Sequence, residues 1–352
     1  MARSGLADLA QGLASEARAL TLEGRRARLG LTAAVAVPLA TIVALALQLD
    51  YPMWAGFYSW LVLKPAVGAT IEDALRRMLA TMVGACLGFM LGAGFAASHL
   101  LTHLALFLIV TACVYKQMTG RRPVFWMMIA LTMVIVTFDS LLTPEVAIIV
   151  AISRCLEVAL GVAVGSLVAF FMLPDEPLPA LPPMSSADAR FTALVAGLTV
   201  TLAPALWFPF QLQGMSAAGF AALLLPHPQE RIERFRTLAI IAGVAIGGAV
   251  GLAAARVQGG ELLPAFALMA AAIFVFGQVH LGGGRVALAG TFMGVGYLVT
   301  NVQGAAPTTD ISPPIWFLVS IVVGALIVLM VSRILSAIFR GGDRPPTGSG
   351  AG

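Results

Sequence analysis

The chain has 352 residues, of which 59% are hydrophobic and only 11% are charged, and its formal net charge is +4. Soluble domains carry ~25% charged residues, and a soluble globule of this length has too little interior to bury so much apolar surface, which excludes a soluble enzyme. The apolar residues form unbroken runs rather than alternating with polar ones, so an outer-membrane barrel is disfavoured as well. The composition therefore predicts an all-α, polytopic membrane protein.

The N-terminal segment, residues 1–28, differs from the rest in its scattered charges and small residues. It has no compact apolar core before a cleavage site, so we do not expect a secretory signal. Leu6, Leu9, Leu13 and Leu20 recur at near-helical spacing. This pattern predicts a short amphipathic helix on the cytoplasmic surface of the membrane.

Uncharged stretches separated by short polar turns predict about twelve membrane spans, each compared with the ~20 residues that a bilayer needs. They cover residues 29–48, 53–71, 78–98, 100–115, 123–138, 146–173, 191–210, 213–229, 237–255, 262–279, 286–302 and 312–332. A Pro-rich linker at 174–189 separates a first group of six spans (29–173) from a second group (190–339). Residues 340–352 are expected to form a disordered tail.

The basic residues lie almost entirely on one side of this predicted membrane. Nineteen of the 21 Lys and Arg residues fall on the cytoplasmic side, in the two terminal segments, in alternate connections and, for Lys64, towards the inner end of the second span. The exceptions are Arg154 and Arg256. The positive-inside rule then places both termini on the cytoplasmic side of the membrane. The same distribution accounts for the net positive charge without nucleic acid as a partner.

The two groups of spans share landmarks at a spacing of about 160 residues, in the same order. The matching pairs are Ala55-Gly56-Phe57 with Ala218-Gly219-Phe220, Lys64-Pro65 with His227-Pro228, and Arg77 with Arg236. Six spans is an even number, so the pattern predicts two parallel six-helix repeats related by a pseudo-twofold axis along the membrane normal. Chance similarity between helices rich in Gly, Ala and Leu is the alternative.

Landmarks of the first repeat also resemble a known family. They are, in order, Arg28, Pro52-x-Trp54, Lys64-Pro65, Arg77 with Gly84 and Gly88, Arg154 with Gly161, and Pro174. This order is similar to that of the FUSC family, the fusaric acid resistance and aromatic carboxylic acid exporter type, over residues 25–175 and less closely over 188–338. The chain resembles a compact form, with only the Pro-rich linker in place of a large soluble cytoplasmic domain and with Lys64 where a polar uncharged residue is expected.

The resemblance implies a protein of the bacterial inner membrane that exports aromatic or other hydrophobic carboxylic acids from the cytoplasm, driven by the proton gradient. It also implies a periplasmic adaptor protein and an outer-membrane channel as partners, and no cofactor. A passive organic-anion channel and a non-transporting scaffold subunit of an envelope assembly are the alternatives. The sequence leaves the oligomeric state open, including a homo-oligomer.

Arg154 and Glu157 are the most informative charges, because they lie within the span 146–173. Three residues apart, they share one helix face and can pair with each other. Charges inside a span are costly and usually face a bundle interior or a wet cavity. Arg154 is therefore a candidate to bind an organic anion, and a partly desolvated Glu157 would suit proton coupling. The alternative is that the outer end of this long span projects from the membrane.

The short second span of each repeat is a further candidate, since interrupted helices at equivalent places often form transporter sites. From Met53 to Lys64 is 12 residues, or ~18 Å of helix against the ~30 Å hydrocarbon core. Lys64 could face a cavity, its counterpart His227 could titrate, and Trp60 could stack on an aromatic substrate. Ordinary helix ends closed by proline are the alternative.

Two further charged residues have both a functional and a simpler interpretation. Arg77 opens the third span and could capture an anion at the inner mouth, although it also serves as a cytoplasmic anchor. Asp139 follows the fifth span on the outer side, either as a solvated loop charge or as a proton-coupling group at an exit mouth.

The five tryptophans fall near the ends of predicted spans, as in an aromatic belt at the two membrane interfaces. Those at the outer interface are Trp54, Trp207 and Trp316, and those at the inner interface are Trp60 and Trp126.

Glycines at four-residue spacing line one face of the third span of each repeat and predict close helix packing. They are Gly84, Gly88 and Gly92 in the first repeat and Gly243, Gly247 and Gly251 in the second. No catalytic triad, HExxH or P-loop pattern is present, so we expect no enzymatic activity. His99 and His103 lack a third ligand nearby in the sequence, so we expect no metal site.

Overall fold

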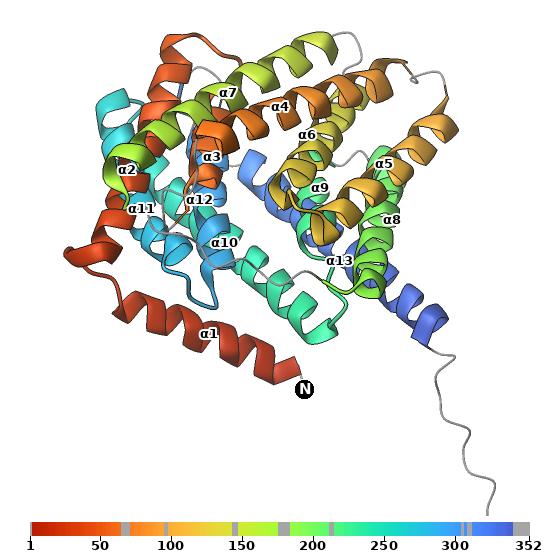
Figure 1. The fold of residues 1–352 in the computed structure, drawn as a ribbon. Coiled ribbons are helices and arrows are strands. Elements are labelled where there is room, and N and C mark those ends of the chain that lie inside the picture. Colours follow the sequence, from red (N-terminus) through yellow and green to blue (C-terminus); the bar gives the residue numbers. More distant parts are fainter. Residues whose placement is uncertain are drawn as a thin grey trace, which may run out of the picture.

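A computed structural model describes residues 2–64, 71–94, 98–142, 147–174, 184–210, 215–303, 306–307 and 312–340. This part of the chain is almost entirely helical, and its helices form one bundle with the N-terminal helix α1 lying across one end (Figure 1). The predicted tail beyond residue 340 and most of the predicted linker lie outside the described residues.

The helices of the first half follow α1 (Ala2–Arg18). They are α2 (Gly24–Ala46), α3 (Pro52–Val62), α4 (Ile71–Phe89) with the π-helical turn η1 (Met90–Gly94), α5 (His99–Thr119), α6 (Pro123–Leu142) and α7 (Ala147–Met172). The second half contains α8 (Ser186–Phe210), α9 (Met215–Leu224), α10 (Glu230–Val257), α11 (Leu262–Leu281), α12 (Ala287–Asn301) and α13 (Ser312–Arg340). The short strands β1 (Val302–Gln303) and β2 (Ala306–Pro307) pair antiparallel between α12 and α13.

Eight helices in the described part are long and apolar enough to cross a membrane: α2, α4 with η1, α5, α6, α7, α10, α11 and α13. The chain is therefore a polytopic, all-α membrane protein, as predicted. The count of twelve spans remains a prediction.

Two predicted spans are much shorter as helices than the sequence suggested. Among the described residues of the ranges 53–71 and 213–229, α3 has 11 residues and α9 has 10 residues, and ~16 Å of helix does not cross a ~30 Å core. Proline disfavours helical backbone in the residue before it. Accordingly α3 ends at Val62, two residues before Lys64-Pro65, and α9 ends at Leu224, just before Leu225-Pro226.

Helix packing follows the same pattern in both halves. In the first half α4 packs on α6 and α3 on α7, and in the second half α10 packs on α12 and α9 on α13. Between the halves, α5 packs on α8 and α11 on α2. Each contact has a counterpart at the equivalent position, which is the arrangement that two repeats around a pseudo-twofold axis would have. The repeat boundaries stay a prediction.

The glycine series lie in two of these equivalent contacts. A Cβ at Gly88 would meet the carbonyl oxygen of Met133 in α6 at 2.8 Å. A Cβ at Gly247 would likewise collide with the carbonyl of Met293 in α12. The other four glycines of the two series also face α6 or α12, so the missing side chains allow the backbones to approach closely.

Three tryptophans do not face the lipid, so the predicted aromatic belt is wrong for them. Trp54, Trp60 and Trp207 are buried inside the bundle. Tryptophan has a large apolar ring system as well as an N–H group. Here the ring systems pack between helices instead of lying at the membrane interface.

Candidate functional site

Arg154 lies deep inside the bundle on α7, with only 3% of its side chain exposed, so it does not project from the membrane. Its Nη1 atom is 3.0 Å from Oε2 of the fully buried Glu157, so the predicted pair is present. One helical turn separates the two residues, which aims both side chains at the same place.

Aromatic rings hold the guanidinium on the side of α3. The Cζ atom of Arg154 is 4.8 Å from the ring centre of Tyr51 and 4.7 Å from that of Trp54. Contacts of this kind stabilise a cation through the negative faces of the rings. The start of α3 therefore positions the cation.

Carboxylates surround the same point. Glu157 Oε1 accepts a hydrogen bond of 2.9 Å from the backbone N–H of Tyr51, the residue that precedes α3. Asp50 accepts one of 2.6 Å from the Ser153 hydroxyl. Asp139 lies near enough to interact electrostatically with Arg154.

The interpretation of Asp139 as a solvated loop charge is wrong. The residue belongs to α6, which continues to Leu142, and its side chain is partly buried. The helix is longer than the predicted span of 123–138, and this extension brings Asp139 to the charged cluster.

The guanidinium is incompletely satisfied. Within the described part of the chain, Nε and Nη1 of Arg154 have no partner in hydrogen-bond geometry, although Nη1 is in ion-pair range of Glu157. A buried donor without a hydrogen bond costs about 1–3 kcal/mol, more for a charged group. The arrangement therefore leaves donors available to an additional acceptor.

A cavity of about 220 Å³ lies directly beyond Trp54. Both halves line it, through the residues Met53, Trp54, Phe57, Ser216, Phe220, Val295, Leu298, Val299, Trp316 and Phe317. Trp54 of α3 and Phe220 of α9 both line it and stack on each other, with ring centres 6.3 Å apart. The two short helices thus meet through aromatic side chains, and one ring separates the cavity from Arg154.

A sequence model of the fusaric acid resistance protein family matches residues 30–206, just over half of the chain. The chain belongs to this family. The match covers the first predicted repeat, the linker and α8, whereas resemblance over the rest of the second half stays a prediction. No curated protein and no solved structure matches the chain.

In this family member, Trp60 is a packing residue and does not line the cavity. Its Nε1–H donates a hydrogen bond of 2.9 Å to the Thr291 carbonyl, and its ring stacks on His280 with centres 4.6 Å apart. The side chain is fully buried against α11 and α12.

The structure does not bring the remaining predicted residues to Arg154. Lys64 and His227 follow the ends of α3 and α9 that point away from the cluster, and Arg77 is buried near the start of α4. His227 lies in the connection to α10, where burial, and then the positive charge of Arg236, lower its pKa from the usual value. Its neutral form is therefore favoured.

Sequence reasoning found Arg154, Glu157 and Asp139 but missed the aromatic lining. Trp54 was assigned to an interface belt, and Phe57, Phe220 and Phe317 carry no individual signal in an apolar chain. The available signal was the pair of matching motifs Ala55-Gly56-Phe57 and Ala218-Gly219-Phe220 in the two short spans.

Proposed function

We propose that this membrane protein exports aromatic or other hydrophobic carboxylic acids and uses the proton gradient to do so. The observation that carries the proposal is the aromatic cavity between the two halves, with Trp54 in contact with a buried guanidinium. Two nitrogens of this guanidinium lack a hydrogen-bond partner among the described residues. Membership of the fusaric acid resistance protein family supports the substrate class.

The cavity matches the apolar part of such a substrate. Its volume of about 220 Å³ is below the ~300–1,000 Å³ of sites for drug-sized ligands, so it suits a monocyclic acid. Trp54, Phe57, Phe220 and Phe317 offer ring faces and edges on which a substrate ring packs.

Arg154 would bind the carboxylate. Arginine presents a planar fork of donors that matches a carboxylate, and a charge-assisted hydrogen bond is stronger in a dry interior than in water. Trp54 stands between the cavity and the guanidinium, so the substrate carboxylate reaches Arg154 when this side chain moves aside.

Protonation of Glu157 would change the charge next to Arg154. Its carboxylate already pairs with Arg154 and competes with a substrate carboxylate for the same donors. Protonation removes that negative charge, so substrate binding at Arg154 and proton binding at Glu157 are linked. Asp50 and Asp139 add further carboxylates to the cluster.

Flux into proteoliposomes tests the proposal. We expect uptake of a monocyclic aromatic acid such as benzoate, after subtraction of the passive uptake into protein-free liposomes, to depend on an imposed pH gradient at clamped voltage. Flux that follows the voltage alone would indicate a passive anion channel. No flux with any of a panel of aromatic acids would indicate a scaffold, and either result would contradict proton-driven export.

A further inference from the structure

A second site lies at the end of the bundle covered by α1. A groove of about 710 Å³ runs between the first half of α1 and the start of α10. Its charged lining residues are Arg231, Arg234, Arg285 and Asp8. The positive-inside rule assigns this end of the bundle to the cytoplasm.

The guanidinium groups in the groove are held loosely. Arg231 is 3.6 Å from Asp8, with 83% of its side chain exposed, and Arg234 is 3.6 Å from the exposed Glu230. Exposed ion pairs of this kind contribute little to stability, because water screens them. A phosphate could therefore recruit these groups, since arginine binds phosphate in a bidentate manner.

Apolar side chains border the same charges. Leu6 of α1 is 58% exposed and Ile232 of α10 is 38% exposed, and Leu238 and Leu329 continue the lining. A soluble anion such as phosphate has no apolar part that could contact this border. A phospholipid has acyl chains next to its headgroup, and these chains could pack against the apolar side chains.

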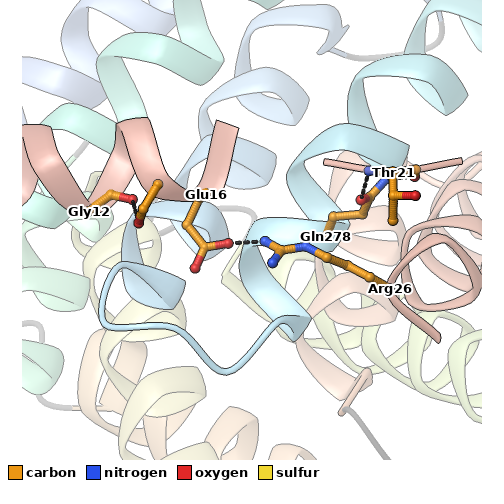
Figure 2. A network of polar contacts seen from close by, with 6 residues as sticks. Gly12, Glu16, Thr21, Arg26 and Gln278 are labelled. Atoms are coloured by element: carbon orange, nitrogen blue, oxygen red, sulfur yellow. Dashed lines mark hydrogen bonds and ion pairs between the residues drawn. The ribbon is translucent and has the colours of Figure 1, made fainter. Parts of the chain in front are cut away.

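The wall formed by α1 is anchored at its far end (Figure 2). Glu16 forms an ion pair with Arg26, and Gln278 exchanges two hydrogen bonds of 3.0 Å with the backbone of Thr21. Gly12 lies against Val286 in the turn before α12. Residues Gly5–Asp8 then extend over α10, where the Asp8–Arg231 pair joins the two walls.

We propose that the groove between α1 and α10 binds the phosphate-bearing headgroup of an anionic phospholipid. Anionic lipids attract basic residues at a membrane surface, and each such residue contributes about 1 kcal/mol. The three arginines supply the charge, and the apolar border selects a lipid over inorganic phosphate.

Native mass spectrometry of the purified full-length protein tests this site. We expect the wild-type chain to retain phosphatidylglycerol but not phosphatidylcholine. Replacing two arginines, as in R231Q/R285Q, should weaken retention roughly 10- to 30-fold. Asp8→Asn should strengthen it, because this variant removes the acidic residue that lines the groove among the described residues. The matched control is R121Q/R122Q, two exposed arginines of the α5–α6 turn, which should behave as wild type.

A second measurement separates the lipid from a soluble anion and from a folding defect. Phosphatidylglycerol should raise the melting temperature of the wild type, whereas inorganic phosphate should not. Equal stabilisation by inorganic phosphate would overturn the proposal. Equal retention of phosphatidylglycerol by the groove variant and its control would do the same, as would a lack of effect of Asp8→Asn.

Discussion

Arg154 is held by an ion pair with Glu157 and by two aromatic rings, yet two of its nitrogens lack hydrogen-bond partners in the part of the chain that the structure describes. A residue with a purely structural role would be expected to have these donors satisfied, because an unsatisfied buried donor is costly. The contact between Glu157 and the start of α3 makes the cluster rigid. The guanidinium of Arg154 can still bind a further acceptor.

Substitutions at this pair should separate binding from proton sensitivity. We expect R154Q to lower benzoate flux about tenfold or more, since a charge-assisted hydrogen bond contributes ~1.5–3 kcal/mol. Glu157→Gln keeps an oxygen for the Tyr51 N–H but removes the competing charge, so its flux should persist and lose its pH dependence. Initial rates in proteoliposomes measure both effects.

Two controls accompany this test. Arg256→Gln removes an exposed arginine at the end of α10 and should leave flux unchanged. The double variant R154Q/E157Q removes both charges of the ion pair, so Glu157 is not left without its partner and a loss of flux reports the guanidinium. Undiminished flux in R154Q at full expression would refute the assignment of Arg154.

Trp54 should determine the preference for aromatic substrates. Trp54→Ala removes a ring that lines the cavity, and aromatic pairs contribute ~0.5–1.5 kcal/mol beyond buried area. We expect the KM for benzoate to rise about 3- to 10-fold while that for an aliphatic acid changes little. Trp126→Ala, at the first turn of α6, is the control. An equal rise for both acids would argue against ring stacking.

His227 should make stability depend on pH. Its pKa is lower in the folded protein than in the unfolded chain, so the unfolded state binds a proton first as the pH falls below about 6.5. Stability is therefore present above that pH and lost below it. Melting temperatures measured between pH 7.5 and 5.5 should fall less for H227Q than for the wild type, and identical slopes would contradict the prediction.

At the scale of the elements, the close packing of α10 against α12 depends on glycine residues. Gly247 and Gly248 are neighbours in α10, yet only Gly247 faces the α12 backbone, and a Cβ at Gly248 would lie 3.6 Å from Thr300 Oγ1. We expect Gly247→Ala to destabilise the protein by ~1–3 kcal/mol through overpacking. Gly248→Ala meets only ordinary van der Waals contact and should be tolerated. Melting temperatures in detergent compare the two, and similar losses would contradict this packing.

At the scale of the whole molecule, each half packs against the other. The first helix of each half packs against the fourth of the other, α2 on α11 and α8 on α5, and the cavity takes its lining from both. We therefore expect fragments 1–183 and 184–352 to co-purify when they are expressed together and to aggregate when alone. Two stable, monodisperse fragments that do not associate would contradict this dependence.

The sequence by itself determined the membrane class, the positions of most helices and the Arg154–Glu157 pair. These follow from local properties: apolar run length, proline positions and the three-residue spacing along a helix. Only the tertiary structure decided that Trp54 lines a cavity, that Asp139 joins the charged cluster and that Trp60 packs against α12. Trp54 meets Phe220, 166 positions further along the chain. Such a contact forms only when the two halves pack together. In a chain with so many apolar residues, sequence spacing alone does not indicate which of them will be in contact.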